Sequence, residues 1–270
     1  MKDAHVNYTA YEGVEKIERF SDQALIDYFN DKISSCDKYV SFFKNFFINH
    51  KLNVLEVGSG SGKLLYRLEK ENILSHGIGY ELSNSRCSFA MKFSNYMNSN
   101  LVIIRNQDFL KSKSKDEKFD VIIGIDVVIN LIAATDENFL DKFFIKAIEK
   151  LKDEGSIILE SITLQREIDS IIKSENGIYY TWKKFLDSDP FKYGLDEMSI
   201  DSKKNIIWKK IFMPRNSGPE EYFTNLLKPL SKNDFSKIAA KYSLKAEFFD
   251  YWELNDDTSD QEFIVILKKQ

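Results

Sequence analysis

Cysteine and histidine are scarce in this chain of 270 residues, and their scarcity removes several kinds of site. The two cysteines, Cys36 and Cys87, are too few for a disulfide framework, and both stand among apolar residues, where we expect free thiols. The three histidines form no His-x-His pair, and no cluster of carboxylates accompanies them. Because metal ligands come as closely spaced sets of such residues, the sequence predicts no metal site.

Long apolar runs and an excess of one charge are also missing. The longest apolar stretch, residues 122–134, is interrupted by Asp126 and Asn130 and is too short to span a bilayer. The first 13 residues are polar and lack the apolar core of a signal peptide. The formal net charge of -4 gives no electrostatic footprint for nucleic acid or an anionic membrane. We therefore expect a cytoplasmic protein that binds neither.

Short apolar runs alternate with longer amphipathic ones from residue 50 onward. The short runs are rich in Val and Ile and nearly continuous in hydrophobicity, which is typical of parallel strands covered on both faces. Alternation of this kind predicts right-handed crossovers and a doubly wound α/β sheet. The predicted strands are residues 53–58, 76–82, 101–105, 119–125 and 155–161, and the helices between them are residues 64–71, 84–97 and 137–152.

The rest of the chain surrounds this core, and we expect one domain overall. Residues 1–50 form an N-terminal helical arm, residues 51–162 and 231–270 form the core, and residues 163–230 form a β-rich insertion. The insertion contains a predicted hairpin around the turn at residues 202–205. An excursion over the strand ends is a natural substrate cap, because α/β sheets bind ligands at that edge. Its aromatic residues either form a small core or wall a pocket: Tyr179, Tyr180, Trp182, Tyr193 and Trp208.

The stretch LEVGSGSGKLL, residues 55–65, is similar to three kinds of ligand-binding loop. It fails the triphosphate-binding pattern, because Leu64 stands where a Ser or Thr must hold magnesium. It fails the dinucleotide fingerprint, because the third glycine falls on Lys63 or Leu65. It fits an acid followed by G-x-G-x-G, through Glu56, Gly58, Gly60 and Gly62. With no phosphate to bind, Lys63 is predicted to face solvent from the first helix of the core.

At this point the sequence resembles the class I Rossmann-like S-adenosylmethionine-dependent methyltransferases of the small-molecule type. Five motifs follow one another in that family's order: EVGSGSG, GIGYELS, NQDFL, FDVIIGIDVV and LKDEGSIIL. They cover about residues 50–162, and the last two predicted strands extend the match. The resemblance implies a seven-stranded, mostly parallel sheet whose last strand is antiparallel, and S-adenosylmethionine as cofactor.

The resemblance also implies which residues bind that cofactor. The loop from Glu56 through Gly58, Gly60 and Gly62 faces the methionine carboxylate; glycines permit close approach, and a helix N-terminus follows them. Glu81 accepts hydrogen bonds from the ribose hydroxyls and Asp108 meets the adenine amino group, with Leu82 and Phe109 beside the ring. One tyrosine of the arm, Tyr8 or Tyr11, covers the methionine end. The alternative for Glu81 and Asp108 is that they are merely solvated acids that end strands.

The candidates for the chemistry are few. Methyl transfer needs a general base only when the nucleophile starts protonated, as an alcohol does. Asp126, at the end of the fourth strand, lines the cofactor–substrate junction in the family; it could pair with an amine or take a proton from an alcohol. The alternative is that Asp126 caps the following helix. Asn130, one turn further, could share the pocket; His5 of the arm is a second catalytic candidate, and Glu160 a weaker one.

We therefore predict transfer of a methyl group to oxygen or nitrogen of a small molecule, by a monomer or homodimer. The inserted hairpin loosely resembles enzymes that modify sugars, sugar nucleotides or related metabolites. Two alternatives stay open: an aminopropyltransferase on the same fold, and a non-catalytic protein that binds S-adenosylmethionine. Aminopropyltransferases carry paired aspartates after the fourth strand, where this chain has only Asp126.

Overall fold

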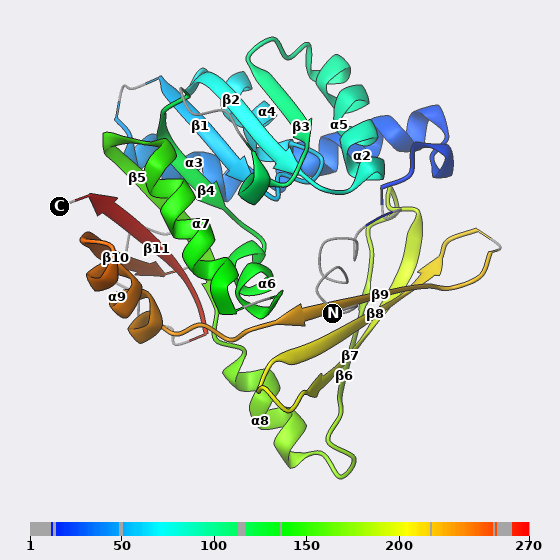
Figure 1. The fold of residues 1–270 in the computed structure, drawn as a ribbon. Helices are drawn as coiled ribbons and strands as arrows, with labels where there is room; N and C mark the ends of the chain where they lie inside the picture. Colours follow the sequence, from blue (N-terminus) through cyan, green and yellow to red (C-terminus); the bar gives the residue numbers. More distant parts are fainter. Residues whose placement is uncertain are drawn as a thin grey trace.

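A seven-stranded sheet organises the chain in the computed structural model, which describes residues 12, 15–48, 51–112, 117–135, 137–216, 218–250, 252 and 261–269. The strand order is β10-β11-β5-β4-β1-β2-β3, and all neighbours are parallel except β11, which is antiparallel to β5 and to β10. This confirms the predicted sheet with its antiparallel last strand (Figure 1). The strands are β1 (Leu52–Val57), β2 (Leu74–Glu81), β3 (Val102–Asn106), β4 (Phe119–Gly124), β5 (Leu151–Ile162), β10 (Leu244–Asp250) and β11 (Glu262–Lys269).

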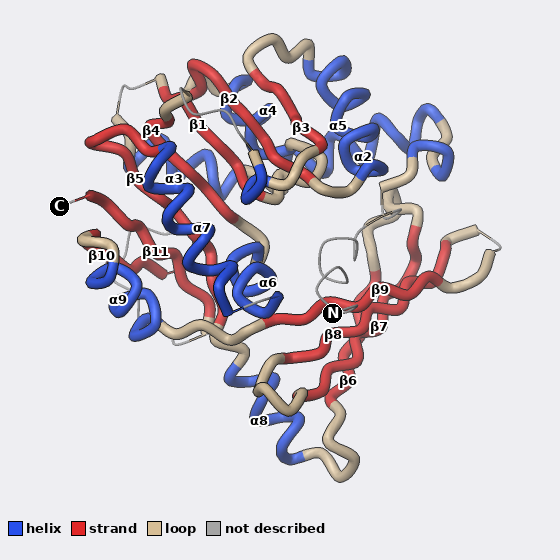
Figure 2. Tube along the Cα trace, viewed as in Figure 1, coloured by secondary structure: helices blue, strands red, loops and turns tan. Residues whose placement is uncertain are grey.

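Helices cover both faces of this sheet, as Figure 2 shows. One core cluster packs α3 (Asp37–Phe46) and α4 (Lys63–Lys70) against the sheet through side chains such as Phe43, Leu65 and Val54. The other packs α6 (Val128–Thr135), α7 (Glu137–Lys150) and α9 (Lys232–Lys241) against the opposite face through Phe143 and Phe235. Burial of both faces explains the nearly continuous hydrophobicity of β1 and β4.

Two further helices enlarge the first layer. α2 (Asp22–Ser34) begins at Ser21, whose hydroxyl accepts a hydrogen bond from the backbone N–H of Ala24, a typical N-cap. It packs on α5 (Asn84–Met97) through an aromatic cluster in which Phe29 and Phe93 stack at 4.7 Å. The helical arm predicted from the sequence is therefore broken into a 3-10 turn, η2 (Ile17–Arg19), and the helices α2 and α3. The predicted residues His5, Tyr8 and Tyr11 lie outside the described residues.

A second, antiparallel sheet follows α8 (Gln165–Lys173) and has the order β6-β7-β8-β9. We call it the cap sheet; its strands are β6 (Tyr179–Lys184), β7 (Phe191–Ile200), β8 (Ile206–Pro214) and β9 (Glu221–Leu227). The predicted hairpin is confirmed as β7–β8, and its turn is closed by Asp201, which accepts the backbone N–H groups of Lys203 and Asn205 at 2.8 Å. Helix α8 was not predicted, and the predicted helix over residues 137–152 ends at Lys150 because Leu151 already begins β5.

Contacts with the N-terminal helices hold the cap sheet over the core. Arg19 forms an ion pair with Glu221 of β9, and its guanidinium lies 5.2 Å from the centre of the Phe191 ring. On α2, Asp31 accepts a hydrogen bond from the hydroxyl of Ser188 in the β6–β7 connection. Among the described residues, no helix combines the length and the apolar character needed to cross a membrane.

Candidate functional site

A cavity of about 460 Å³ opens at the carboxyl ends of the parallel strands, where the crossover topology brings several loops together. Its wall includes the glycine loop after β1, the ends of β2 and β3, and the turn that joins β4 to α6. Lys32 of α2 and two residues of the cap sheet, Trp208 and Lys210, also line it. One cavity therefore joins the predicted cofactor residues with the predicted cap.

The glycine loop requires glycine at two positions for steric reasons. Gly58, Gly60 and Gly62 have φ angles of 69°, 55° and 74°, in the left-handed region that L side chains avoid. A Cβ atom on Gly58 would lie 2.7 Å from Val128, and one on Gly62 would lie 2.8 Å from the ring of Tyr66. The backbone can thus run close to the cavity and enter α4 directly from Gly62.

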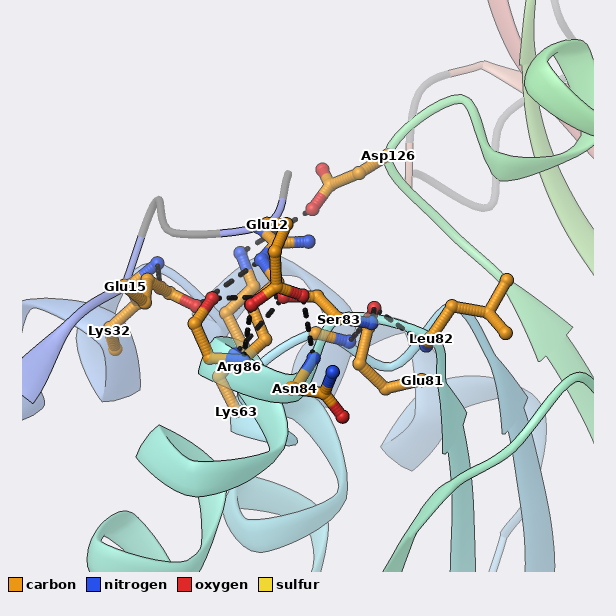
Figure 3. Close-up of polar contacts among 12 residues, drawn as sticks. Glu12, Glu15, Lys32, Lys63, Glu81, Leu82, Ser83, Asn84, Arg86 and Asp126 are labelled. Carbon is orange, nitrogen blue, oxygen red and sulfur yellow. Dashed lines mark hydrogen bonds and ion pairs between the residues drawn. The ribbon is translucent and has the colours of Figure 1, made fainter. Parts of the chain in front are cut away.

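Glu81 is fixed at the end of β2 by three backbone N–H groups. One carboxylate oxygen accepts from Gly60 at 2.7 Å, and the other accepts from Leu82 at 2.9 Å and from Ser83 at 2.8 Å (Figure 3). Ser83 is also the N-cap of α5, whose hydroxyl accepts from the backbone of Arg86 at 3.2 Å. Since a carboxylate has about four acceptor sites, Glu81 keeps capacity for a ligand hydroxyl while its orientation is set.

The residues predicted beside the adenine share one wall of the cavity. Leu82, Asp108 and Phe109 all line it. One carboxylate oxygen of Asp108 accepts the backbone N–H of Leu110 at 2.8 Å and so caps the short helix η3 (Phe109–Lys111). The ring of Phe109 meets Tyr80 edge-on at 5.5 Å. The geometry thus provides an apolar surface next to an acid.

The turn after β4, which we call the elbow, consists of Asp126 and Val127. Their φ angles are 53° and 60°, an unusual conformation for two successive non-glycine residues and a strained one for a β-branched valine. The Asp126 side chain is 64% exposed and points toward Lys63, whose ammonium lies 3.7 Å away (Figure 3). One carboxylate oxygen of Asp126 is therefore directed toward Lys63 at the cavity wall.

Lys63 does not face bulk solvent, and that prediction was wrong. Its side chain is 20% exposed and lines the cavity. Lys63 is the first residue of α4, and side chains on a helix lean toward its N-terminus, which here lies beside the elbow. Its ammonium is therefore placed between the glycine loop and Asp126.

Asn130 also departs from its predicted role. It is 0% exposed, and its amide nitrogen donates to the carbonyl oxygens of Ile162 at 2.9 Å and of Lys228 at 2.8 Å. It is absent from the residues that line the cavity described above. We assign it a structural role, in which it ties α6 to the end of β5 and to the segment after β9.

Two buried acids stand at the inner end of the cavity. Burial raises the pKa of Glu56 well above its usual value, with Lys63 opposing and Asp126 and Glu81 adding to the rise. Within the described part of the chain, no group donates to Glu56 Oε2. Burial likewise raises the pKa of Glu160, which also lines the cavity. A buried carboxylate oxygen at a cavity wall fits a cationic amino group, such as that of a bound amino acid moiety.

An ion cluster that sequence reasoning missed lies against the glycine loop. Buried Glu15 pairs with Lys32 at 2.5 Å and with Arg86 at 3.4 Å, and the Tyr28 hydroxyl donates to it at 3.2 Å. Burial alone would raise the pKa of Glu15, but the two cations and these hydrogen bonds outweigh it and lower the pKa to about 2. A Cβ atom added to Gly60 would lie 3.3 Å from the guanidinium of Arg86, so the cluster adjoins the glycine loop. No local pattern marks Glu15, because its partners come from α2 and α5.

A second acid of the N-terminal segment reaches the same region. Glu12 accepts the backbone N–H groups of Asn84 at 2.8 Å and of Ser85 at 3.0 Å, at the start of α5 (Figure 3). A carboxylate at a helix N-terminus is favourable there, because it satisfies free N–H groups and complements the helix dipole. Glu12 is therefore attached to the start of α5, which follows Glu81.

The sheet order, the antiparallel β11 and an acid facing the glycine loop together define the class I fold of S-adenosylmethionine-dependent methyltransferases. Residues 48–214 match the family model described as a methyltransferase domain, and the chain belongs to this family. The protein is accordingly an S-adenosylmethionine-dependent methyltransferase. A comparison with curated protein sequences finds no match.

Solved structures of methyltransferases share the fold. CcbJ from Streptomyces caelestis has a TM-score of 0.70 at 15% identity, over 86% of this chain and 89% of that one. An S-adenosylmethionine-dependent methyltransferase from Clostridium acetobutylicum has a TM-score of 0.70 at 16% identity, over 90% and 97%. CalS10, an amino pentose methyltransferase from Micromonospora echinaspora, has a TM-score of 0.62 at 13% identity, over 88% and 91%. At these identities the likeness concerns the fold.

Proposed function

We propose that the protein transfers a methyl group from S-adenosylmethionine to an oxygen or nitrogen atom of a small molecule bound between the elbow and the cap sheet. The observation that carries this proposal is the continuity of one cavity. Its wall runs from Glu81 and the glycine loop, through Asp126, to Trp208 and Lys210 of the cap sheet. A donor and an acceptor can therefore meet beside Asp126.

In this proposal the cofactor lies along the ends of β1, β2 and β3. Glu81 uses its remaining acceptor capacity for a ribose hydroxyl, and Asp108 accepts from the adenine amino group, with Leu82 and Phe109 against the ring. The backbone of Gly58 and Gly60 faces the methionine carboxylate. The buried carboxylate of Glu56 pairs with the methionine amino group, which supplies the donor that Glu56 Oε2 has nowhere else in the described residues. When bound, S-adenosylmethionine supplies an electrophilic methyl group on a sulfonium.

The chain contributes two things to the reaction: it positions the reactants, and it supplies the carboxylate of Asp126. Methyl transfer forms a bond from the acceptor heteroatom to the methyl carbon while the carbon–sulfur bond breaks, so alignment in a site that excludes water accounts for much of the rate. Asp126 stands on the cavity side of the elbow, where it can orient an amine nucleophile or accept the proton that an alcohol loses. Trp208 and Lys210 of the cap sheet line the same cavity as Asp126.

A sugar or a related metabolite is the acceptor class we favour. Two methyltransferases that share the fold are described as acting on such compounds: CalS10 on an amino pentose, and KedS8 from Streptoalloteichus on a sugar nitrogen. The cavity is of the size that binds small ligands, and the net charge of -4 does not favour a polyanion.

Calorimetric titration tests the cofactor half of the proposal. Wild-type protein should bind S-adenosylmethionine and S-adenosylhomocysteine at micromolar concentrations, and should bind nicotinamide dinucleotides far more weakly. Glu81→Ala should weaken binding at least tenfold, because a buried carboxylate bonded to the ribose is lost. Glu154→Ala, on the exposed part of β5, is the matched control and should bind like wild type. A folded wild-type sample that does not bind at tens of micromolar would refute the proposal.

Product mass then separates methyl transfer from the two alternatives. The enzyme, S-adenosylmethionine and a pool of small metabolites should yield S-adenosylhomocysteine together with a product heavier by one methylene group. An aminopropyltransferase would need the decarboxylated cofactor and would release methylthioadenosine. A non-catalytic binding protein would yield neither product while still giving the calorimetric signal.

A further inference from the structure

The cap sheet turns one face to the cavity, and the strand register identifies the residues on it. Directly paired residues of antiparallel strands point to the same face. Trp208 and Lys210 of β8 both line the cavity, so their partners face the same way. Asp196 of β7 pairs with Lys210, and Asn225 of β9 pairs with Trp208. We call these four residues the polar band.

The polar band lies between two apolar clusters on this face. On one side it borders a cluster containing Ile206 and Leu227, against which Trp208 also packs. On the other side it borders a cluster of phenylalanines, Phe191, Phe212 and Phe223. Burying polar groups between two apolar clusters is costly unless something bonds to them.

In the polar band, the acceptor Asp196 Oδ1 and the donor Trp208 Nε1 are buried and have no bonding partner among the described residues. Asp196 is only 7% exposed, so bulk water does not readily satisfy it. The Lys210 ammonium lies 3.8 Å from the centre of the Trp208 ring and so borders both residues. Buried polar atoms are normally bonded; Trp208 lines the cavity and Asp196 lies on the same face of the sheet, so these atoms point to a ligand that enters from the cavity.

The chemistry of these two atoms selects the ligand. An anion only accepts hydrogen bonds and leaves Asp196 Oδ1 unsatisfied, whereas an ammonium only donates them and leaves Trp208 Nε1 unsatisfied. A hydroxyl group does both. The opposite formal charges of Asp196 and Lys210 also leave the polar band neutral, which suits an uncharged polar group.

We propose that the polar band is the acceptor subsite and that it binds the hydroxyl groups of a polyhydroxylated, sugar-like ring. This inference rests on the proposed methyl transfer, because it places the acceptor in the cavity shared with Asp126. Trp208 packs in the same cluster as Val127 of the elbow, so a ring held by Trp208 lies next to the reacting end of the site.

Calorimetric titration of protein saturated with S-adenosylhomocysteine tests the subsite with three probes. Glucosamine carries hydroxyls and an amine, cyclohexylamine keeps the ring and the amine without hydroxyls, and inorganic pyrophosphate is an anion. Glucosamine should bind saturably, and cyclohexylamine and pyrophosphate should bind at least about tenfold more weakly, the effect of losing one or more hydrogen bonds. Tighter binding of pyrophosphate would indicate an anion site, and equal binding of cyclohexylamine an amine pocket; either result overturns the proposal.

Variants on the two faces of the cap sheet locate the subsite. Asp196→Ala and Trp208→Phe should each weaken glucosamine binding about tenfold or more. Trp208→Phe keeps most of the ring packing, so it remains informative should Asp196→Ala fail to fold. Lys209→Met and Glu197→Gln remove an ion pair of 2.7 Å on the opposite face and should bind like wild type. The subsite is refuted if Trp208→Phe binds glucosamine with wild-type affinity. It is also refuted if the opposite-face variants lose as much glucosamine affinity as Asp196→Ala and Trp208→Phe. Calorimetry with S-adenosylhomocysteine alone separates such a result from failure of the cofactor site.

Discussion

Glu160 accepts a hydrogen bond from the backbone N–H of Asp126 at 3.2 Å, which joins the end of β5 to the elbow after β4. The same carboxylate oxygen accepts from the indole N–H of Trp252 at 3.2 Å. Trp252 is itself held edge-on by Tyr39 at 4.5 Å and by Phe42 at 5.2 Å, both on α3. A strained elbow persists only where its surroundings fix it, and this chain of contacts fixes the backbone from which Asp126 projects.

Replacing Glu160 should therefore affect turnover more than cofactor binding. We expect Glu160→Ala to lower kcat about tenfold or more, because the Asp126 carboxylate loses its fixed position, while the Kd for S-adenosylhomocysteine changes little. Glu160→Gln keeps an acceptor oxygen and should restore most of kcat. Steady-state kinetics with calorimetry on the same samples checks the separation. A parallel loss of cofactor affinity in both variants would mean that Glu160 acts on the cofactor site instead.

Asp126 is expected to act on the acceptor. Asp126→Ala should lower kcat by about 10²-fold or more with an alcohol acceptor, the usual range for loss of a general base, and less with an amine. Binding of S-adenosylmethionine should remain within about threefold of wild type. Asp153→Ala, an exposed acid on β5, serves as the control and should keep full turnover. If Asp126→Ala loses cofactor affinity as severely as Glu81→Ala, the carboxylate has been misassigned.

Glu56 should make stability depend on pH in a predictable direction. Burial raises its pKa, so the folded protein favours the protonated form, and that stabilisation is present at low pH and lost as the pH rises through the raised pKa. Glu56→Gln, which stays neutral, should match wild type near pH 4. At pH 8 its free energy of unfolding should exceed that of wild type by roughly 1–3 kcal/mol, the usual cost of an incompletely bonded buried group. Urea unfolding at both pH values measures this.

The same substitution should weaken the cofactor site. In the proposed function Glu56 pairs with the methionine amino group, so a more stable Glu56→Gln protein should still bind S-adenosylmethionine less tightly, by about tenfold. If Glu56→Gln is more stable than wild type but binds S-adenosylmethionine equally tightly, Glu56 does not contact the cofactor.

Glu15 should show the opposite dependence on pH. Its pKa is lowered to about 2, so its stabilisation is complete above the ordinary glutamate value near 4.5 and is lost as the pH falls through about 2. Glu15→Gln leaves Lys32 and Arg86 without their buried anion and should lower the free energy of unfolding by about 3–5 kcal/mol at pH 7. The difference from wild type should narrow as the pH falls from 4.5 toward 2. Glu18→Gln, exposed on η2, is the control and should show no such trend.

Gly58 allows steric clash to be separated from backbone strain. Gly58 and Gly177 have nearly equal φ angles, 69° and 68°, but a Cβ on Gly177 would meet no atom within 4 Å. Gly177→Ala should therefore cost only about 1 kcal/mol of stability, from strain in the left-handed region. Gly58→Ala adds a contact of 2.7 Å with Val128, and we expect a larger loss, above about 2 kcal/mol, together with weaker cofactor binding. Equal losses in the two variants would show that Val128 moves aside freely.

Much of the fold could be predicted because its signals are local. Val- and Ile-rich runs predicted the strands of the parallel sheet, and the helix over residues 84–97 matches α5 to the residue. Glu81, Asp108 and Asp126 could be proposed together because each follows a strand, and the carboxyl ends of parallel strands meet at one edge of a sheet. The structure places all three on the wall of one cavity.

The sequence by itself determined the strands, the glycine loop and the strand-end acids, because these depend on periodicity and on backbone freedom within a few residues. Only the tertiary structure decided that Lys63 faces Asp126, that Asn130 donates to carbonyl groups 32 and 98 residues further along the chain, and that Glu15 meets Arg86 against the loop. It also decided that Asp196 lies on the same face of the cap sheet as Trp208 and Lys210, which line the cavity. Such relationships arise from the docking of distant segments, whose geometry no local pattern encodes.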